Sequence, residues 1–345
     1  SLAPLCSGQS LWYCSRNSIH TTCGAMALTQ WYDRCVTALS EITRVNEKRV
    51  GSEIVTIGHN TAVLTYFSPF EGRYVWKLLT LNDDHSLCES PFPVPGPLST
   101  RFRPALVYVR DALVVCGTWK SDGNWCIGVY IYFPSEDSWG SVPLPGGLHP
   151  RREPCLFSCG ESRVVLAGGH DAHYVEVYDA WQLDIAIMEW RELYNSTYVS
   201  LPSAASYLSY GDRCVFPGFV GCIISVQHNT LQVEYEGWTN TSRWERDPGT
   251  VLACIGDGTQ RLLLTYNHLP SGREECQREE VYLYDVVSGD LRLCEPLPSR
   301  MGTPVSVTGA MINPTTAVFI GETQAVVLDV LPGVLNPDCN YYAEI

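Results

Sequence analysis

The stretch His170-Asp171-Ala172-His173 is the part of the chain whose residue types and spacing come closest to a metal-binding motif. Two imidazoles and a carboxylate within four residues offer three donors that Zn, Fe or Cu accept. No matching donors follow in the other predicted loops, and nucleophile-elbow, phosphate-loop and HExxH motifs are absent from the sequence. We therefore expect no cofactor and no catalytic residues, and keep a metal site on His170, Asp171 and His173 as the alternative.

Arginine residues form a second group with clear chemistry. They gather between predicted strands, and the segments 41–50, 91–104, 145–154, 193–203, 246–250 and 296–304 together hold nine basic residues against four acidic ones. The planar guanidinium matches carboxylate and phosphate groups. The sequence therefore predicts that an acidic or phosphorylated peptide binds to these arginines: Arg44, Arg49, Arg101, Arg103, Arg151, Arg152 and Arg300.

Aromatic residues near the same segments strengthen the prediction of a binding surface. Trp119 and Trp125 flank the polar stretch 120–124, and Tyr266 ends another predicted strand. Trp, Tyr and Arg dominate the binding energy of protein interfaces. We predict that these three aromatic residues contact the partner, although each could instead fold back onto its own strands.

Composition excludes several classes of protein. The chain has 345 residues, 45% of them hydrophobic and only 17% charged, and its net charge is -14. These values argue against disorder, a coiled coil and a nucleic-acid-binding surface, and the apolar runs are too short for a membrane helix. No signal peptide is visible, and the fifteen cysteines, an odd number, mostly lie in apolar stretches. We expect a reduced cytoplasmic protein, with the nucleus and secretion left open.

A repeat of about 49 residues positions these side chains. Each unit has four short β-rich runs separated by turn residues, which is the signature of strands. Seven units start near residues 3, 54, 105, 154, 204, 251 and 305. We expect the third strand of the unit at 154 to be Tyr174–Asp179, and the third and fourth strands of the unit at 204 to be Thr230–Glu236 and Ser242–Arg246. We also expect the last strand of the chain at Asn340–Tyr342 and a long loop at Gly117–Cys126.

Repeated four-stranded units of this size predict an all-β fold, namely a β-propeller of seven four-stranded blades. Six blades is the alternative count. The propeller would be a single domain over 1–345. A β-sandwich is the competing fold.

Several residues resemble those of the Kelch family of propellers. Tyr132 and Trp139 have the Kelch spacing of a tyrosine, six residues and a tryptophan. Gly168-Gly169 matches the double glycine of that family, and Tyr178-Asp179 and Tyr284-Asp285 match its Tyr-Asp pair. The resemblance implies that these residues are structural, and that Arg103, Arg152 and Arg300, each shortly before a blade, serve structure as readily as binding.

The resemblance also implies a function. Kelch propellers often act as substrate receptors of ubiquitin ligases, joined to a BTB or F-box region that contacts cullin-ligase components outside a chain such as this one. We accordingly predict a protein-interaction module that binds a partner on the face formed by the second loop of each blade and the connections between blades. A scaffold role fits the residues equally well. The alternative is a metal-dependent enzyme similar to galactose oxidase, which needs Tyr and His ligands from several blades.

Overall fold

The computed structural model describes residues 43–44, 49–84, 86–195, 208–210, 213–216, 222–227, 229–235, 250–256, 261–268, 278–285, 291–294, 308–313, 316–321 and 324–329. In these ranges the chain forms β-strands and one short 3-10 turn, η1 (Gly96–Leu98), and no α-helix. None of the described residues forms a helix long and apolar enough to cross a membrane. The predicted all-β class is therefore confirmed.

Successive strands pair in antiparallel order to form four-stranded units. The first unit contains β2 (Val50–Gly58), β3 (Thr61–Ser68), β4 (Arg73–Leu81) and β5 (Leu87–Pro91). The second contains β6 (Ala105–Val109), β7 (Ala112–Ser121), β8 (Asn124–Phe133) and β9 (Ser138–Val142). The third contains β10 (Cys155–Ser158), β11 (Arg163–Ala167), β12 (Ala180–Asp184) and β13 (Glu189–Asn195).

The remaining strands repeat this arrangement. The fourth unit contains β14 (Leu208–Tyr210), β15 (Arg213–Phe216), β16 (Cys222–Gln227) and β17 (Thr230–Tyr235). The fifth contains β18 (Thr250–Gly256), β19 (Arg261–His268), β20 (Arg278–Asp285) and β21 (Leu291–Cys294). The last contains β22 (Thr308–Asn313), β23 (Thr316–Ile320) and β24 (Gln324–Asp329). A short parallel pairing of β13 with β17 joins the third and fourth units into one eight-stranded sheet.

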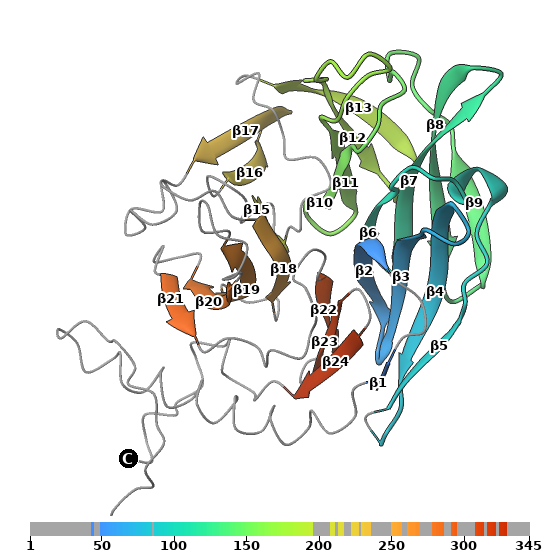
Figure 1. The fold of residues 1–345 in the computed structure, drawn as a ribbon. Coiled ribbons are helices and arrows are strands. Elements are labelled where there is room, and N and C mark those ends of the chain that lie inside the picture. The colour runs from blue at the N-terminus through green and yellow to red at the C-terminus, as the bar shows by residue number, and fades with distance from the viewer. Residues whose placement is uncertain are drawn as a thin grey trace, which may run out of the picture.

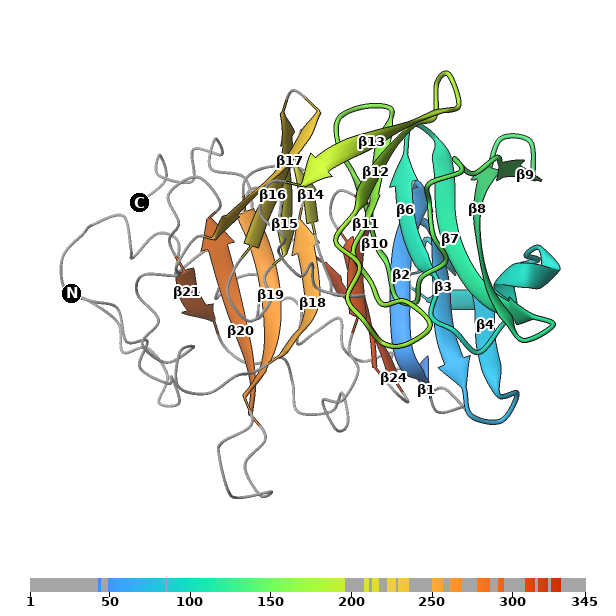
Figure 2. The same ribbon diagram turned by 90° about the horizontal axis from the view of Figure 1, so that it is seen from above.

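The units are arranged around a common centre (Figure 1). Their first strands lie innermost and pack against one another, β14 with β18, β18 with β22, β22 with β2, β2 with β6, and β6 with β10. Figure 2 shows the molecule turned by 90°, with the strands of each sheet running side by side. The arrangement is that of a propeller-like fold.

The last unit is completed from the other end of the chain. Strand β1 (Thr43–Arg44) pairs antiparallel with β24, Thr43 facing Ala325 and Arg44 facing Gln324. The sequence instead predicts Asn340–Tyr342 as this fourth strand, and those residues lie outside the described ranges, as does the whole predicted unit that starts near residue 3. The described strands thus form six four-stranded units.

The hydrophobic core lies between neighbouring sheets. Strand β6 shows how one strand contributes to two cores: Val107 packs in the cluster shared with the third unit, which includes Leu156, whereas Leu106 packs in the cluster shared with the first unit, which includes Trp76. Successive residues of a strand point to opposite faces of the sheet. Both faces are covered, so the run Ala112–Cys116 is buried throughout.

Tryptophans near the outer strands bridge consecutive units. Trp139 contacts Tyr132 at 5.2 Å between ring centroids, and its indole N–H donates to the carbonyl of Pro93 at 3.0 Å. Trp190 donates in the same way to the carbonyl of Pro143 at 2.9 Å. In both cases the acceptor follows the last strand of the preceding unit. The second and third units therefore make the same tryptophan contact with the unit before them.

Two strand predictions differ from the structure. The segment Tyr174–Asp179, predicted as a third strand, is a loop. Gly168 and Gly169 at the end of β11 have φ of 63° and 88° and turn the chain away from the sheet. The strand that pairs with β11 is therefore Ala180–Asp184. In the fourth unit the third strand is β16, and the segment Thr230–Glu236, expected as the third strand, forms the fourth, β17. The predicted fourth strand, Ser242–Arg246, lies outside the described residues.

The predicted long loop Gly117–Cys126 is mostly strand. Strands β7 and β8 continue their pairing out to Ser121 and Asn124, leaving a two-residue turn at Asp122-Gly123. Both turn residues have positive φ, 51° and 82°, the conformation that a tight hairpin with Asp-Gly requires. The hairpin is therefore a rigid projection that carries Lys120 and Trp125 as directly opposed residues.

The division of the core into separate layers between sheets predicts a specific pattern of coupling. Replacing Val107 and Leu156 together by alanine should be non-additive, with a coupling energy of about 0.5–3 kcal/mol, because both belong to one cluster. The matched pair Leu106→Ala and Leu156→Ala should be additive to within about 0.5 kcal/mol, since Leu106 faces the other sheet. Urea unfolding of the single and double variants measures both; equal coupling in the two cycles would contradict the layered packing.

Candidate functional site

Loops between β3 and β4, β7 and β8, and β11 and β12 meet the connections between units on one face. Arg73 donates to the hydroxyl of Ser99 at 2.7 Å, and the Thr118 hydroxyl donates to the carbonyl of Arg151 at 2.6 Å. Arg152 and His170 exchange two backbone hydrogen bonds of 2.7 and 2.9 Å. The second loop of a unit therefore lies beside the connection that leads into the next unit.

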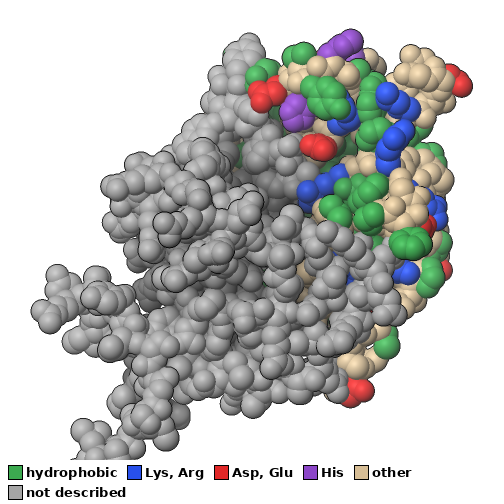
Figure 3. Space-filling model, in the orientation of Figure 1, with side chains coloured by type: hydrophobic (Ala, Val, Ile, Leu, Met, Phe, Trp, Pro, Cys, Tyr) green, Lys and Arg blue, Asp and Glu red, His purple; other side chains and the backbone are tan. Residues whose placement is uncertain are grey.

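A group of cations and aromatic rings occupies this face, and we call it the cation–aromatic patch: Arg101, Phe102, Lys120, Trp125, Arg152 and Tyr174. The Trp125 ring is at its centre, 4.7 Å from Phe102 in an edge-to-face contact. Both the Lys120 ammonium, at 4.7 Å, and the Arg152 guanidinium, at 4.8 Å, lie over the Trp125 ring. On the face shown in Figure 3, Lys and Arg side chains lie among hydrophobic ones in the described part of the molecule.

Arg152 is held between two rings. Its guanidinium carbon lies 3.5 Å from the centroid of Tyr174 as well as 4.8 Å from that of Trp125. Tyr174 is 74% exposed and Lys120 is also exposed, so the patch is open to solvent. Stacked cations of this kind contribute about 0.5–2 kcal/mol each. The arrangement fixes the orientation of Arg152 while leaving the patch accessible.

The loop that carries Tyr174 is built on Gly169 and Asp171. A Cβ at Gly169 would lie 2.5 Å from the carbonyl oxygen of Arg152, so only glycine lets the loop approach this closely. One carboxylate oxygen of Asp171 accepts the backbone N–H groups of His173 at 2.7 Å and Val175 at 2.9 Å. The Val175 N–H, the largest cause, and that of His173 lower the pKa of Asp171, with a smaller contribution from Arg152.

Hydrogen bonds within the loop engage part of the His170-Asp171-Ala172-His173 motif. One Asp171 oxygen is already engaged by two backbone N–H groups, and the backbone of His170 pairs with Arg152 and Glu176. Within the described part of the chain, no three His, Cys, Asp or Glu side chains gather closely enough to hold a metal ion. Among the described residues the proposed ligands of this loop are therefore not assembled around a common point.

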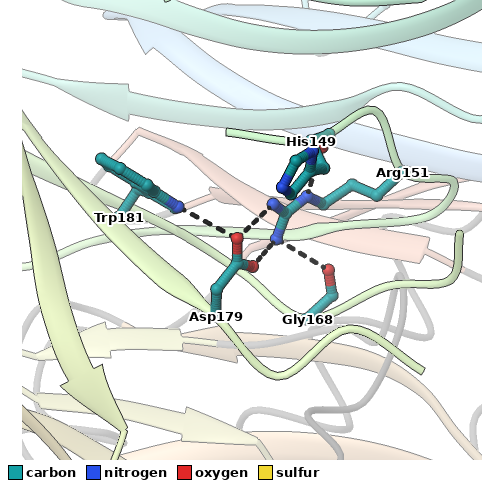
Figure 4. A network of polar contacts seen from close by, with 5 residues as sticks. All are labelled: His149, Arg151, Gly168, Asp179 and Trp181. Atoms are coloured by element: carbon teal, nitrogen blue, oxygen red, sulfur yellow. Dashed lines mark hydrogen bonds and ion pairs between the residues drawn. The ribbon is translucent and has the colours of Figure 1, made fainter. Parts of the chain in front are cut away.

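Arg151, predicted to bind a partner, is 1% exposed and belongs to an internal network (Figure 4). Its guanidinium forms a bidentate pair with Asp179, donating to one carboxylate oxygen from Nη1 and to the other at 2.7 Å from Nη2. It also donates to the carbonyls of His149 at 3.1 Å and Gly168 at 3.4 Å, while the Trp181 indole donates to Asp179 at 3.0 Å. Arg151 therefore joins the connection after β9 to the loop before β12.

Arg49 and Arg103 also pair with internal carboxylates. Arg49 is fully buried, 2.6 Å from Glu89, and stacks on Tyr66 at 5.0 Å. Arg103 lies 3.6 Å from Glu53, whose pKa is raised because burial outweighs the opposing effect of Arg103. Arg49 is inaccessible to a partner, and Arg103 remains about one-quarter exposed.

Of the other residues predicted to contact a partner, some lie in the patch and the rest lie outside it. Trp119 faces Cys126 across the hairpin, one position from the Lys120–Trp125 pair, so the two tryptophans project from opposite faces. Arg101 and Arg152 lie in the patch. The side chains of Arg44 and Tyr266, and all of Arg300, lie outside the described part of the structure.

Sequence reasoning missed three members of the patch: Phe102, Lys120 and Tyr174. Phe102 stands between two arginines that were selected, and Lys120 precedes the Asp122-Gly123 turn that places it opposite Trp125. The Asp-Gly dipeptide was a usable signal, because it is the strongest short-range indication of a tight hairpin. Tyr174 was assigned to a strand, and only the loop geometry brings it over Arg152.

Comparisons with known proteins identify a similar fold and no family. No protein-family model matches the chain, and no curated protein matches it. A solved structure described as that of YjhT is similar with a TM-score of 0.59 at 13% sequence identity, over 84% of this chain and 97% of that chain. At this identity the similarity supports a propeller-like fold and carries no information on activity.

The bidentate pair of Arg151 predicts a large loss of stability on breaking it. Asp179→Asn should lower the free energy of unfolding by about 3–5 kcal/mol, because the buried guanidinium loses its counter-charge. Asp184→Asn is the matched control, since Asp184 pairs with a half-exposed Arg163 and should cost less than about 1 kcal/mol. Equal shifts of the urea midpoint in the two variants would show that the network is not a structural anchor.

The close approach at Gly169 predicts a second effect on stability. Gly169→Ala should cost about 1–3 kcal/mol, because its φ of 88° is strained for alanine and the new methyl group meets the Arg152 carbonyl. Gly146→Ala, where a Cβ meets no atom within 4 Å, should change stability by less than about 0.5 kcal/mol. Thermal unfolding measures both, and unchanged stability of Gly169→Ala would refute the proposed constraint.

Proposed function

We propose that this protein is a protein-interaction module that binds an acidic peptide segment of its partner, with negative charge supplied by carboxylates or phosphate. The supporting observation is the cation–aromatic patch, in which Arg152 and Lys120 share the Trp125 ring on the face where loops and connections meet. Arginine with exposed aromatic rings is the typical composition of an interface hot spot. The chain carries no carboxylate within ion-pair distance of these two cations in its described residues.

The scaffold supports this use of the face. A rigid ring of sheets positions loops at strand ends, where binding residues commonly lie. We further propose that six blades close the ring, since β1 completes the last of six described units. The double glycine and the Tyr132–Trp139 contact support membership of the Kelch family, and through that resemblance a role as substrate receptor of a ubiquitin ligase, whose cullin-ligase contacts would lie outside this chain.

Charge reversal on the patch tests the proposed function. Immobilised wild-type protein and an Arg101→Glu/Arg152→Glu variant are offered fluorescent peptide pools of net charge -4, 0 and +4. Wild type should retain the acidic pool in preference to the other two, and the variant should lose that preference by at least about tenfold, because two attractions become repulsions.

The control is Arg163→Glu, which makes the same type of change on a half-exposed arginine that begins β11 and pairs with Asp184. This variant should behave as wild type in the peptide assay. The proposal fails if wild type shows no preference for acidic peptides, or if all three proteins retain the acidic pool equally.

A further inference from the structure

We propose that the patch recognises a phosphoryl group on a serine or threonine of the partner, held jointly by Lys120 and Arg152. This inference rests on the proposed function and narrows its ligand from any acidic peptide to a phosphopeptide. It follows from how the two cations are placed and from which groups they do not contact.

Lys120 and Arg152 stand apart from most other described cations. Carboxylates lie within ion-pair distance of five arginines: Arg49, Arg73, Arg103, Arg151 and Arg163. Lys120 and Arg152 have no such partner among the described residues, and the hydrogen bond of the Arg152 side chain runs to the carbonyl of Asp171 at 3.4 Å. The Nε of Arg152 is buried and has no hydrogen-bond partner in the described structure. The Arg152 side chain thus makes one hydrogen bond in the described structure, and the donors left for an external anion are those of its Nη groups, since the buried Nε is closed to solvent.

The aromatic rings hold the Arg152 guanidinium ready for an anion. The Arg152 guanidinium carbon lies close to both the Trp125 and the Tyr174 ring, so the two rings restrict where this side chain can move. The N–H groups of a guanidinium donate in its plane. Lys120 lies over the same Trp125 ring, so its ammonium and the Arg152 guanidinium carbon are no more than 9.5 Å apart, the sum of their distances to the ring centroid. Because the rings already restrict the side chain, less conformational entropy is lost when the anion binds.

The charge of the patch favours a phosphate over a carboxylate. A phosphorylated side chain carries about -1.5 to -2 at neutral pH and three acceptor oxygens, whereas a carboxylate carries -1 and two. Arg101, Lys120 and Arg152 supply three positive charges, and the ionised Asp171 lies among them. Asp122 in the hairpin turn and Glu153 beside Arg152 are also acidic and exposed, whereas exposed charges more than about 8 Å away are largely screened at physiological ionic strength.

The test compares peptide pools that differ at one position. Four pools share a degenerate sequence of fixed net charge apart from a central Ser, Asp, phosphoserine or phosphothreonine. They are offered to the full chain as wild type, Lys120→Gln, Arg152→Lys and the control Arg163→Gln. Urea unfolding of each variant confirms that it is folded under the conditions of the assay.

Wild type should retain the phosphorylated pools at least about tenfold better than the Asp pool, and Lys120→Gln should remove this advantage. Arg152→Lys should reduce it as well, because an ammonium keeps the charge but lacks the planar edge. Arg163→Gln should leave it unchanged.

Each opposite result has a distinct meaning. Equal retention of the Asp and phosphorylated pools overturns the phosphoryl inference while the binding of acidic peptides stands. Preference for phosphate that survives Lys120→Gln and Arg152→Lys places the phosphate site elsewhere and also overturns it. Retention of no acidic pool by wild type refutes the proposed function itself.

Discussion

The burial of both faces of a sheet, seen where the structure describes the side chains, is the constraint on which the rest of the structure depends. Successive side chains of a strand enter different hydrophobic clusters, as Leu106 and Val107 do. A sheet of this kind is stable only between two neighbours, so the units must follow one another around a centre. The strand ends and the loops beside them then carry the accessible side chains, and the cation–aromatic patch lies there, where loops and connections meet.

The same constraint explains what the sequence could predict. Short β-rich runs and turn residues identified the all-β class and most strands of the first, second and fifth described units, because each strand is a local pattern. The error at Tyr174–Asp179 has a physical cause. Its alternation of Val and Tyr is strand-like, but Gly168 and Gly169 had already turned the chain out of β11. Pairing partners, rather than propensity, decide which of two adjacent β-rich segments enters the sheet.

The arginines show where sequence reasoning must stop. Arg151 and Arg152 are neighbours with the same chemistry, yet Arg151 is buried against Asp179 and Arg152 stacks between Trp125 and Tyr174. Their partners lie far along the chain, in other units, and no local pattern reveals them. Sequence therefore identified half of the residues that the structure gathers in the patch, Arg101, Trp125 and Arg152. The division into structural and accessible arginines needed the fold.

The pairing of β1 with β24 has a consequence for biosynthesis. Thr43 leaves the ribosome long before its partner Ala325, a delay of roughly 15–60 s at ordinary rates of translation. During that interval the sheets beside the incomplete position have an uncovered apolar face, and β1 has no strand to pair with. Exposed faces and strand edges of this kind favour aggregation and chaperone binding. Premature termination before β24 is therefore expected to leave a chain that cannot complete its ring, whatever the intrinsic stability of the earlier sheets.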